Sequence, residues 1–361
     1  MMKIFLVKLI LLLLLFVFNT LGNLTNTIQN LYAQEVNQGA WEEYKQKREK
    51  IAELLDIPKS IESKINWSWL KKDVSVVDIE GSLNFFRYTV ENLNVPKKVS
   101  MYPFHYSANF STEEGSQYIK RMGYLLTSNY KSKYEDLNKR GLIVFYCGSG
   151  TDLSLVLDPK NYHNAAPLLL CYLLHYNVVV IPYIDSSYKC SLKNINEIAN
   201  IYISCYSAID CSFEILKKFD IPYDENAIYS TGVSYGGYCA LVHAAFDDWI
   251  KKVFSVSGIH DFNTYLDPTG GIIYGGVNAV IPLIENDINP NDIYGLINAD
   301  ISFCYAMYDG YFGPTKFLIM QNAKKYRELR GIKNTKFLGL TSVKSHEWPV
   351  IEGLSYFSGL E

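Results

Sequence analysis

Residues 227–242 read AIYSTGVSYGGYCALV and place one serine, Ser234, among three glycines. The residues before Ser234 are β-branched and aromatic and favour a strand, whereas those after it favour a helix. The segment GVSYG at 232–236 matches G-x-S-x-G, in which a sharp strand-to-helix turn strains the serine backbone and raises its oxygen above the sheet. Glycines flank the serine because side chains there would clash as the turn closes. The stretch therefore predicts a nucleophilic serine.

The chain around this turn alternates short apolar runs with helical patterns from Gly141 onward. Continuous apolar strands separated by helices indicate an α/β fold, with a mostly parallel sheet covered by helices on both faces. The functional loops of such a sheet lie at the carboxyl ends of its strands. We expect strands at 142–146, 178–181, 227–230, 253–256, 301–308 and 335–340, and helices at 165–175, 194–219, 235–246 and 313–329.

The chain is expected to divide near residue 141. Residues 34–140 would form an elaboration of a helix and β-strands, packed on a catalytic core that comprises residues 141–361. The expected elements of the first part are a helix at 41–55, two strands within 74–95 and a surface helix or loop at 111–138.

One segment of the core, residues 263–299, fits poorly as a further strand–helix unit. It is long, apolar and rich in glycine in its first half. We interpret it as an insertion that caps the site. The alternative is a pair of surface helices without functional consequence.

Ser234 needs a base, because a serine hydroxyl is a poor nucleophile until a positioned group takes its proton. In sites built on this kind of turn the chain order is nucleophile, acid, histidine. His346 fits this order, since it lies in SVKSHEWP just after the last expected strand; an exposed loop histidine is the alternative interpretation. The other histidines precede Ser234, lie on the helix that follows it, or leave no room for an acid before them: His105, His163, His175, His243 and His260.

The acid should follow a strand at the same edge of the sheet. Asp309 directly follows the apolar run ISFCYAMY, where a base could meet it. Asp300 precedes that run and would lie at the opposite edge. Asp261, after the strand at 253–256, is the rival of Asp309. The role of the acid is to hold the imidazole tautomer and to stabilise the imidazolium.

The oxyanion of an acyl-transfer intermediate needs preorganised N–H donors. The N–H of Tyr235, the residue after the nucleophile, is one candidate. The second is expected from the loop CGSG at 147–150, with Ser149 or Gly148 as the donor. This loop is not a dinucleotide-binding fingerprint, because G-S-G-T-D-L lacks the third glycine.

Composition excludes several classes of function. The formal net charge is −3 and no basic stripe indicates a nucleic-acid partner. None of the seven cysteines forms a C-x-x-C pair, and neither a metal nor an organic cofactor is implied. Buried thiols are expected at Cys171, Cys239 and Cys304, and one disulfide could involve two of Cys190, Cys205 and Cys211, although not the pair 205 and 211.

The first residues resemble a targeting signal. The apolar run Leu9–Phe18 has ten residues, and about twenty are needed to cross a bilayer. A signal peptide at residues 1–33 with cleavage after Ala33 is therefore expected, and an uncleaved N-terminal anchor is the alternative. Either way the folded part would lie outside the cytoplasm, secreted or periplasmic, with no stable membrane span after cleavage.

The catalytic motifs resemble those of the α/β-hydrolase superfamily. The resemblance rests on the serine turn, the CGSG loop, YDGYFGP at 308–314 and SHEWP at 345–349, and it covers roughly residue 141 to the C-terminus. GVSYGGY is similar to the turn of prolyl-oligopeptidase-like enzymes and of acetyl-xylan-type and dienelactone-type esterases. The chain departs from the peptidases, since it has no propeller and reads CGSG instead of GGP.

The resemblance implies serine-dependent acyl transfer. We expect an exported enzyme that hydrolyses carboxylic esters, either of small molecules or linked to polysaccharides. A small peptidase of the prolyl-oligopeptidase type is one alternative, and a catalytically silent binding protein on a hydrolase scaffold is another.

Overall fold

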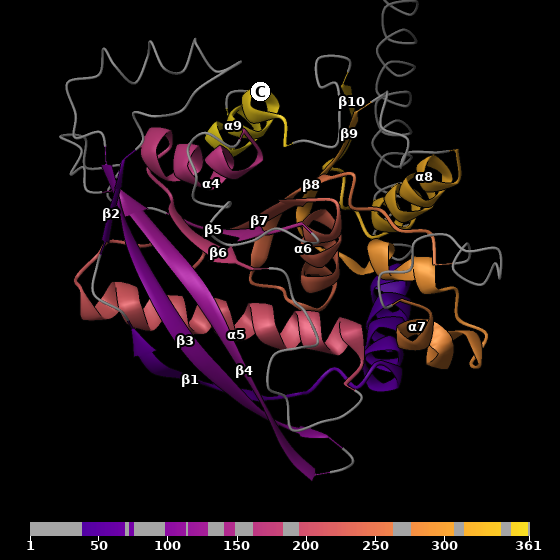
Figure 1. Ribbon diagram of the computed structural model, residues 1–361. Coiled ribbons are helices and arrows are strands. Elements are labelled where there is room, and N and C mark those ends of the chain that lie inside the picture. Colours follow the sequence, from indigo (N-terminus) through magenta and orange to yellow (C-terminus); the bar gives the residue numbers. More distant parts are fainter. Residues whose placement is uncertain are drawn as a thin grey trace, which may run out of the picture.

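The computed structural model arranges the chain around one ten-stranded sheet (Figure 1). The order of its hydrogen-bonded strands is β1-β3-β4-β6-β5-β7-β8-β9-β10, and β2 pairs with β3 beside this path. The structure describes residues 38–68, 72–75, 98–112, 115–128, 141–148, 162–182, 195–262, 276–306, 314–340 and 348–359.

The sheet has an antiparallel part and a parallel part. The pairs β1–β3, β2–β3, β3–β4 and β4–β6 are antiparallel. The pairs β6–β5, β5–β7, β7–β8, β8–β9 and β9–β10 are parallel. The antiparallel strands come first in the chain: β1 (Ile61–Ser68), β2 (Lys72–Ser75), β3 (Lys98–Thr112) and β4 (Gly115–Ser128). The parallel strands are β5 (Leu142–Tyr146), β6 (Asn177–Ile181), β7 (Ile228–Val233), β8 (Ile250–Val256), β9 (Asp300–Ala306) and β10 (Thr335–Leu340).

Helices cover both faces of the sheet, as expected (Figure 1). One hydrophobic cluster joins α4 and α9 to one face, and another joins α5, α6, α8 and the first helix, residues 38–54, to the other face. Parallel strands that are buried on both sides explain why the sequence shows them as unbroken apolar runs. The bounds are α4 (Tyr162–Leu173), α5 (Glu197–Lys218), α6 (Tyr235–Phe246), α7 (Gly276–Ile284), η3 (Pro290–Leu296), α8 (Pro314–Leu329) and α9 (Val350–Ser358).

The α/β pattern predicted from residue 141 onward is confirmed, and each expected strand and helix lies within a few residues of its observed position. The described part of the expected insertion, residues 276–299, contains α7 and η3. Its role as a cap stays a prediction. Most of the segment 74–95, in which two strands were expected, lies outside the described residues.

The expectation of a surface helix or loop at 111–138 is wrong where the structure describes it, because β4 occupies Gly115–Ser128. The strand pairs with β3 along its whole length. Its first residues are polar because the tip of the β3–β4 hairpin is exposed, whereas Gly123 to Thr127 are buried in the sheet. The polar tip hid the strand pattern in the sequence.

Polar contacts attach the first helix to residues that follow α8 and that precede β8 and β9. The Arg330 guanidinium, just after α8, lies 4.0 Å from the ring centroid of Tyr44, whose hydroxyl accepts a hydrogen bond from Asn298 Nδ2 at 2.7 Å. Arg48 Nη1 lies 2.8 Å from Asp248 Oδ2. The strands before and after residue 141 share one sheet, and the first helix packs against the same domain.

The described cysteines are buried: Cys147, Cys171, Cys205, Cys211, Cys239 and Cys304. Burial at Cys171, Cys239 and Cys304 was predicted from their apolar neighbours. Cys190 lies outside the described residues. Among the helices that the structure describes, none combines the length and the apolar character needed to span a membrane.

The winding of the parallel sheet reverses at β5. The chain leaves β5 for β6 on one side and then crosses to β7 on the other side. A crevice forms at the carboxyl ends of the strands at such a reversal, and ligands of open α/β sheets bind there. The carboxyl ends of β5 and β7 carry the CGSG loop and the serine turn, so topology places both at this point.

Candidate active site

Ser234 occupies a strained turn between β7 and α6. Its backbone angles are φ 57° and ψ −125°, a conformation that a residue with a Cβ rarely adopts. Two hydrogen bonds fix the turn: Ser234 N donates to Val256 O at 2.9 Å, and Tyr238 N donates to Ser234 O at 3.0 Å. The residue is only partly buried. The predicted strand–serine–helix turn is present.

The glycines of the turn allow backbone segments to meet without side chains between them. A Cβ on Gly232 would lie 2.5 Å from the carbonyl carbon of Gly236 and 2.8 Å from Tyr146 O. A Cβ on Gly236 would overlap the backbone of Tyr146. The turn is therefore packed directly against the carboxyl end of β5.

This packing brings the described oxyanion candidates to one place. Tyr235 begins α6 directly after Ser234, and Gly148 is two residues beyond the end of β5. Cys147 N, between β5 and Gly148, donates to Ile181 O at 3.0 Å and so fixes the start of the loop. Ser149, the other candidate in this loop, lies outside the described residues.

The overall similarity of the chain to solved structures decides the fold. A glucuronoyl esterase from Solibacter usitatus matches with a TM-score of 0.52 at 12% identity, over 86% of this chain and 90% of the esterase. A second structure of a glucuronoyl esterase from the same organism gives a TM-score of 0.50 at 11% identity, over 85% and 90% of the two chains. The protein has the α/β-hydrolase fold.

A further match has a slightly lower TM-score. A rice cell wall degrading esterase, LipA from Xanthomonas oryzae, has a TM-score of 0.49 at 12% identity, over 82% of this chain and 96% of that chain. No protein-family model matches the chain, and no curated protein matches it significantly. The α/β-hydrolase fold is therefore recognised through structure and not through overall sequence similarity.

The predicted base and acid, His346 and Asp309, lie outside the described residues of this α/β-hydrolase fold. Their flanking strands are described: β9 ends three residues before Asp309, and β10 ends six residues before His346. Because β9 and β10 are parallel neighbours, both residues follow strands that end at the same edge of the sheet as Ser234.

Trp348, two residues after the predicted base, is anchored beside the nucleophile strand. Its side chain is fully buried, and Trp348 Nε1 donates to Thr231 Oγ1 in β7 at 2.8 Å. Thr231 is three residues before Ser234. The contact ties the residues just before α9 to β7.

Asp261, the rival acid, is held by η3. The residue is 4% exposed, and its carboxylate accepts a hydrogen bond from Asn291 Nδ2 at 3.0 Å. Asn291 Oδ1 in turn accepts from Phe262 N at 3.2 Å. Asp261 lines a cavity of about 210 Å³ together with residues of η3 and α8. The Asn291 contact fixes the Asp261 carboxylate against η3.

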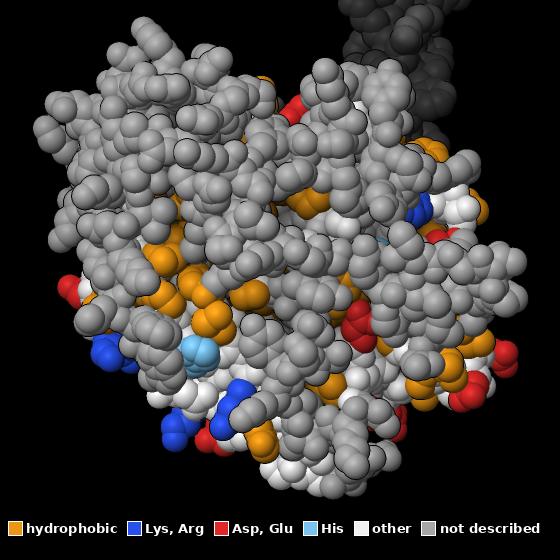
Figure 2. Space-filling model, viewed as in Figure 1, with side chains coloured by type: hydrophobic (Ala, Val, Ile, Leu, Met, Phe, Trp, Pro, Cys, Tyr) orange, Lys and Arg blue, Asp and Glu red, His pale blue; other side chains and the backbone are white. Residues whose placement is uncertain are grey.

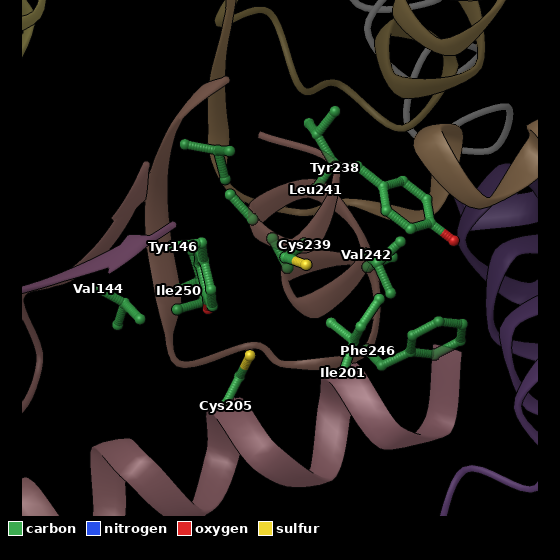
Figure 3. Packing of buried hydrophobic residues seen from close by; sticks show 14 of the residues in the cluster. Val144, Tyr146, Ile201, Cys205, Tyr238, Cys239, Leu241, Val242, Phe246 and Ile250 are labelled. Atoms are coloured by element: carbon green, nitrogen blue, oxygen red, sulfur yellow. The ribbon is translucent and has the colours of Figure 1, made fainter. Parts of the chain in front are cut away.

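His243 is a packed residue of the helix after Ser234, as the sequence indicated, and it belongs to a buried polar row. The Tyr146 hydroxyl lies 2.7 Å from His243 Nδ1, and His243 Nε2 lies 2.8 Å from Asp247 Oδ2. Asp247 Oδ1 accepts from Trp249 N at 2.8 Å. Figure 3 shows the Tyr146 side chain in the apolar layer above α5, which carries Cys205. The row links β5 to the far end of α6.

We predict that Asp247→Asn lowers the free energy of unfolding by about 1–3 kcal/mol at neutral pH, because a buried charged hydrogen-bonding group is lost. Burial alone would raise the pKa of Asp247, but His243, Trp249 N–H and Arg48 together lower it below its ordinary value. The ionised carboxylate therefore stabilises the fold above the unfolded pKa of about 3.9, and this contribution is lost as pH falls through the folded pKa.

Urea denaturation of wild type and variant between pH 3 and 7 measures this difference. It should be constant above about pH 5 and shrink below about pH 4. Asp248→Asn is the matched control, since the neighbouring Asp248 side chain is 60% exposed and its substitution should have a smaller effect on stability. A difference that grows on acidification would contradict the assignment.

Sequence reasoning missed the residues that hold the Tyr235 side chain. The Tyr235 hydroxyl donates to Glu197 Oε1 at 2.8 Å. Glu197 is the first residue of α5, and Asn196 is its N-cap. The pair Asn-Glu at a helix start is a recognisable N-terminal signal, and it follows the strand at 177–181, so its place at the carboxyl edge could have been found.

On the face seen in Figure 2, several described basic side chains lie near acidic ones. Charge on the described part of this face is therefore mixed in sign.

Proposed function

We propose that the protein is an exported serine hydrolase that cleaves carboxylic esters through an acyl-enzyme, with Ser234 as nucleophile, His346 as base and Asp309 as acid. The observation that carries this proposal is the strained backbone of Ser234 in a G-x-S-x-G turn at the carboxyl end of a central parallel strand. A non-glycine residue in that conformation is kept where surrounding structure enforces it, and such strain is concentrated at functional sites.

The reaction follows from the roles of these residues. His346 takes the hydroxyl proton as Ser234 Oγ attacks the ester carbonyl, and Asp309 orients the imidazole. The N–H groups of Tyr235 and of Ser149 or Gly148 stabilise the tetrahedral oxyanion. The intermediate then expels the alcohol, which receives the proton from His346. A water molecule activated by His346 attacks the acyl-enzyme and releases the acid. No cofactor is required.

An ester substrate is supported by the Solibacter usitatus neighbour, which is a glucuronoyl esterase. Export is proposed because the apolar run Leu9–Phe18 resembles the core of a signal peptide. Acyl or aryl esters, free or linked to polysaccharides, are the proposed substrate class.

A substrate panel tests the proposal. The purified protein should react with a fluorophosphonate probe at Ser234, identified by peptide mass spectrometry. It should hydrolyse nitrophenyl and sugar-acetate esters faster than Xaa-Pro and acyl-peptide amides. Faster amide turnover would favour a peptidase of the prolyl-oligopeptidase type. If the protein neither reacts with the probe nor hydrolyses any ester, the result would favour a catalytically silent binding protein on a hydrolase scaffold.

A further inference from the structure

The start of α5 contacts both the serine turn and α7. Glu197 Oε1 accepts the Tyr235 hydroxyl at 2.8 Å. The side chain of Asn196 acts in two directions: its Oδ1 accepts from Ile198 N at 2.9 Å and caps α5, while its Nδ2 donates to Ala279 O in α7 at 2.8 Å. One turn of α5 therefore connects the residue after the nucleophile to a helix of the predicted cap segment.

Glu197 is held there at an energetic disadvantage. The first residue of a helix usually presents its carboxylate to water near the helix N-terminus, where the helix dipole favours the charge. Glu197 instead has a buried Oε2 atom that finds no hydrogen-bond partner among the described residues. Burial raises the pKa of its carboxyl group. A buried polar atom without a partner costs free energy, and each such atom in a native fold calls for an explanation.

The location supplies that explanation. Tyr235 carries the N–H that is expected to donate to the oxyanion, and the residue directly follows the strained Ser234. Tyr235 is 1% exposed, and its hydroxyl is held by Glu197. The ring centroids of Tyr235 and Tyr238 lie 5.8 Å apart. The backbone strain at Ser234 persists only where the surroundings determine the conformation. The hydrogen bond from the Tyr235 hydroxyl to Glu197 limits how far the Tyr235 side chain can rotate.

We infer that Glu197 is a positioning residue, which holds the Tyr235 side chain so that its N–H points at the developing oxyanion, and that Asn196 couples this arrangement to the position of α7. The kinetic part of this inference rests on the proposed serine-hydrolase function. The structural part concerns the turn and α7 alone.

Steady-state kinetics on the best ester substrate tests the kinetic part. Glu197→Ala and Tyr235→Phe should each lower kcat roughly 10- to 100-fold, because small misplacements of a donor have effects of this size. KM should stay within about twofold. The double variant should be no slower than the slower single variant, since both changes remove one hydrogen bond.

Glu197→Gln should restore most of the activity lost in Glu197→Ala, because its Oε1 can still accept the hydroxyl. Glu214→Ala is the matched control: the same substitution on the same helix at an exposed position, expected to leave kcat unchanged. A Glu197→Ala enzyme within twofold of wild type, or a glutamine variant as slow as the alanine variant, would overturn the inference.

Hydrogen exchange without substrate separates this inference from the proposed function. Glu197→Ala should increase exchange in peptides covering 234–241 and 276–284. Asn196→Ser, which keeps a capping oxygen but cannot reach Ala279, should increase exchange mainly at 276–284. If wild type fails to react with the fluorophosphonate probe, the proposed function fails while these exchange results still decide the structural part. Unchanged exchange in both variants would refute that part even in an active enzyme.

Discussion

Replacing Ser234 with alanine is expected to lower kcat by about a millionfold, the size of effect seen when the nucleophile of a serine triad is removed. The reason is chemical, since alanine has no oxygen to form the acyl-enzyme, while the remaining oxyanion donors and binding contacts leave slow residual turnover. Steady-state ester hydrolysis and labelling by the fluorophosphonate probe measure the loss.

The fold should survive this change. Alanine carries the same Cβ as serine, so the strain of the φ 57° conformation is unaltered, and Ser234 N and O keep their hydrogen bonds to Val256 and Tyr238. The midpoint of thermal unfolding should therefore stay close to that of wild type. Ser358→Ala, at an exposed serine of α9, is the control. Near-wild-type activity in Ser234→Ala would exclude this nucleophile.

Asp309→Asn is expected to lower kcat by about 10,000-fold, because an amide in place of the acid favours the wrong tautomer of the base. β9 ends three residues before Asp309, at the same edge of the sheet as β7, which Ser234 directly follows. The measurement is kcat on the same ester, together with urea denaturation to show that the fold persists.

Asp261→Asn serves as the comparison. Its carboxylate contacts Asn291 of η3, so we expect loss of up to about 1–3 kcal/mol of stability and a kcat within about tenfold of wild type. A larger fall in kcat for Asp261→Asn than for Asp309→Asn would transfer the role of the acid to Asp261.

Much of the α/β core was predictable because its signals are local. Buried parallel strands are short apolar runs, and helix periods are visible within a few turns. The last strand was predicted at 335–340, where β10 lies. The polar tip of β4 did not give such a signal, since its pairing with β3 and its burial depend on the whole sheet.

The candidate site divides in the same way. The sequence by itself determined the serine turn, because the glycines that permit the turn adjoin Ser234, and it proposed Ser149, Asp309 and His346 as partners. Only the tertiary structure decided which groups hold that turn and the helix that follows it. Glu197 and Tyr235 are 38 residues apart and Tyr146 and His243 are 97 apart, and no local pattern specifies such pairs. They meet because helices pack on a common sheet, and packing is a property of the whole chain.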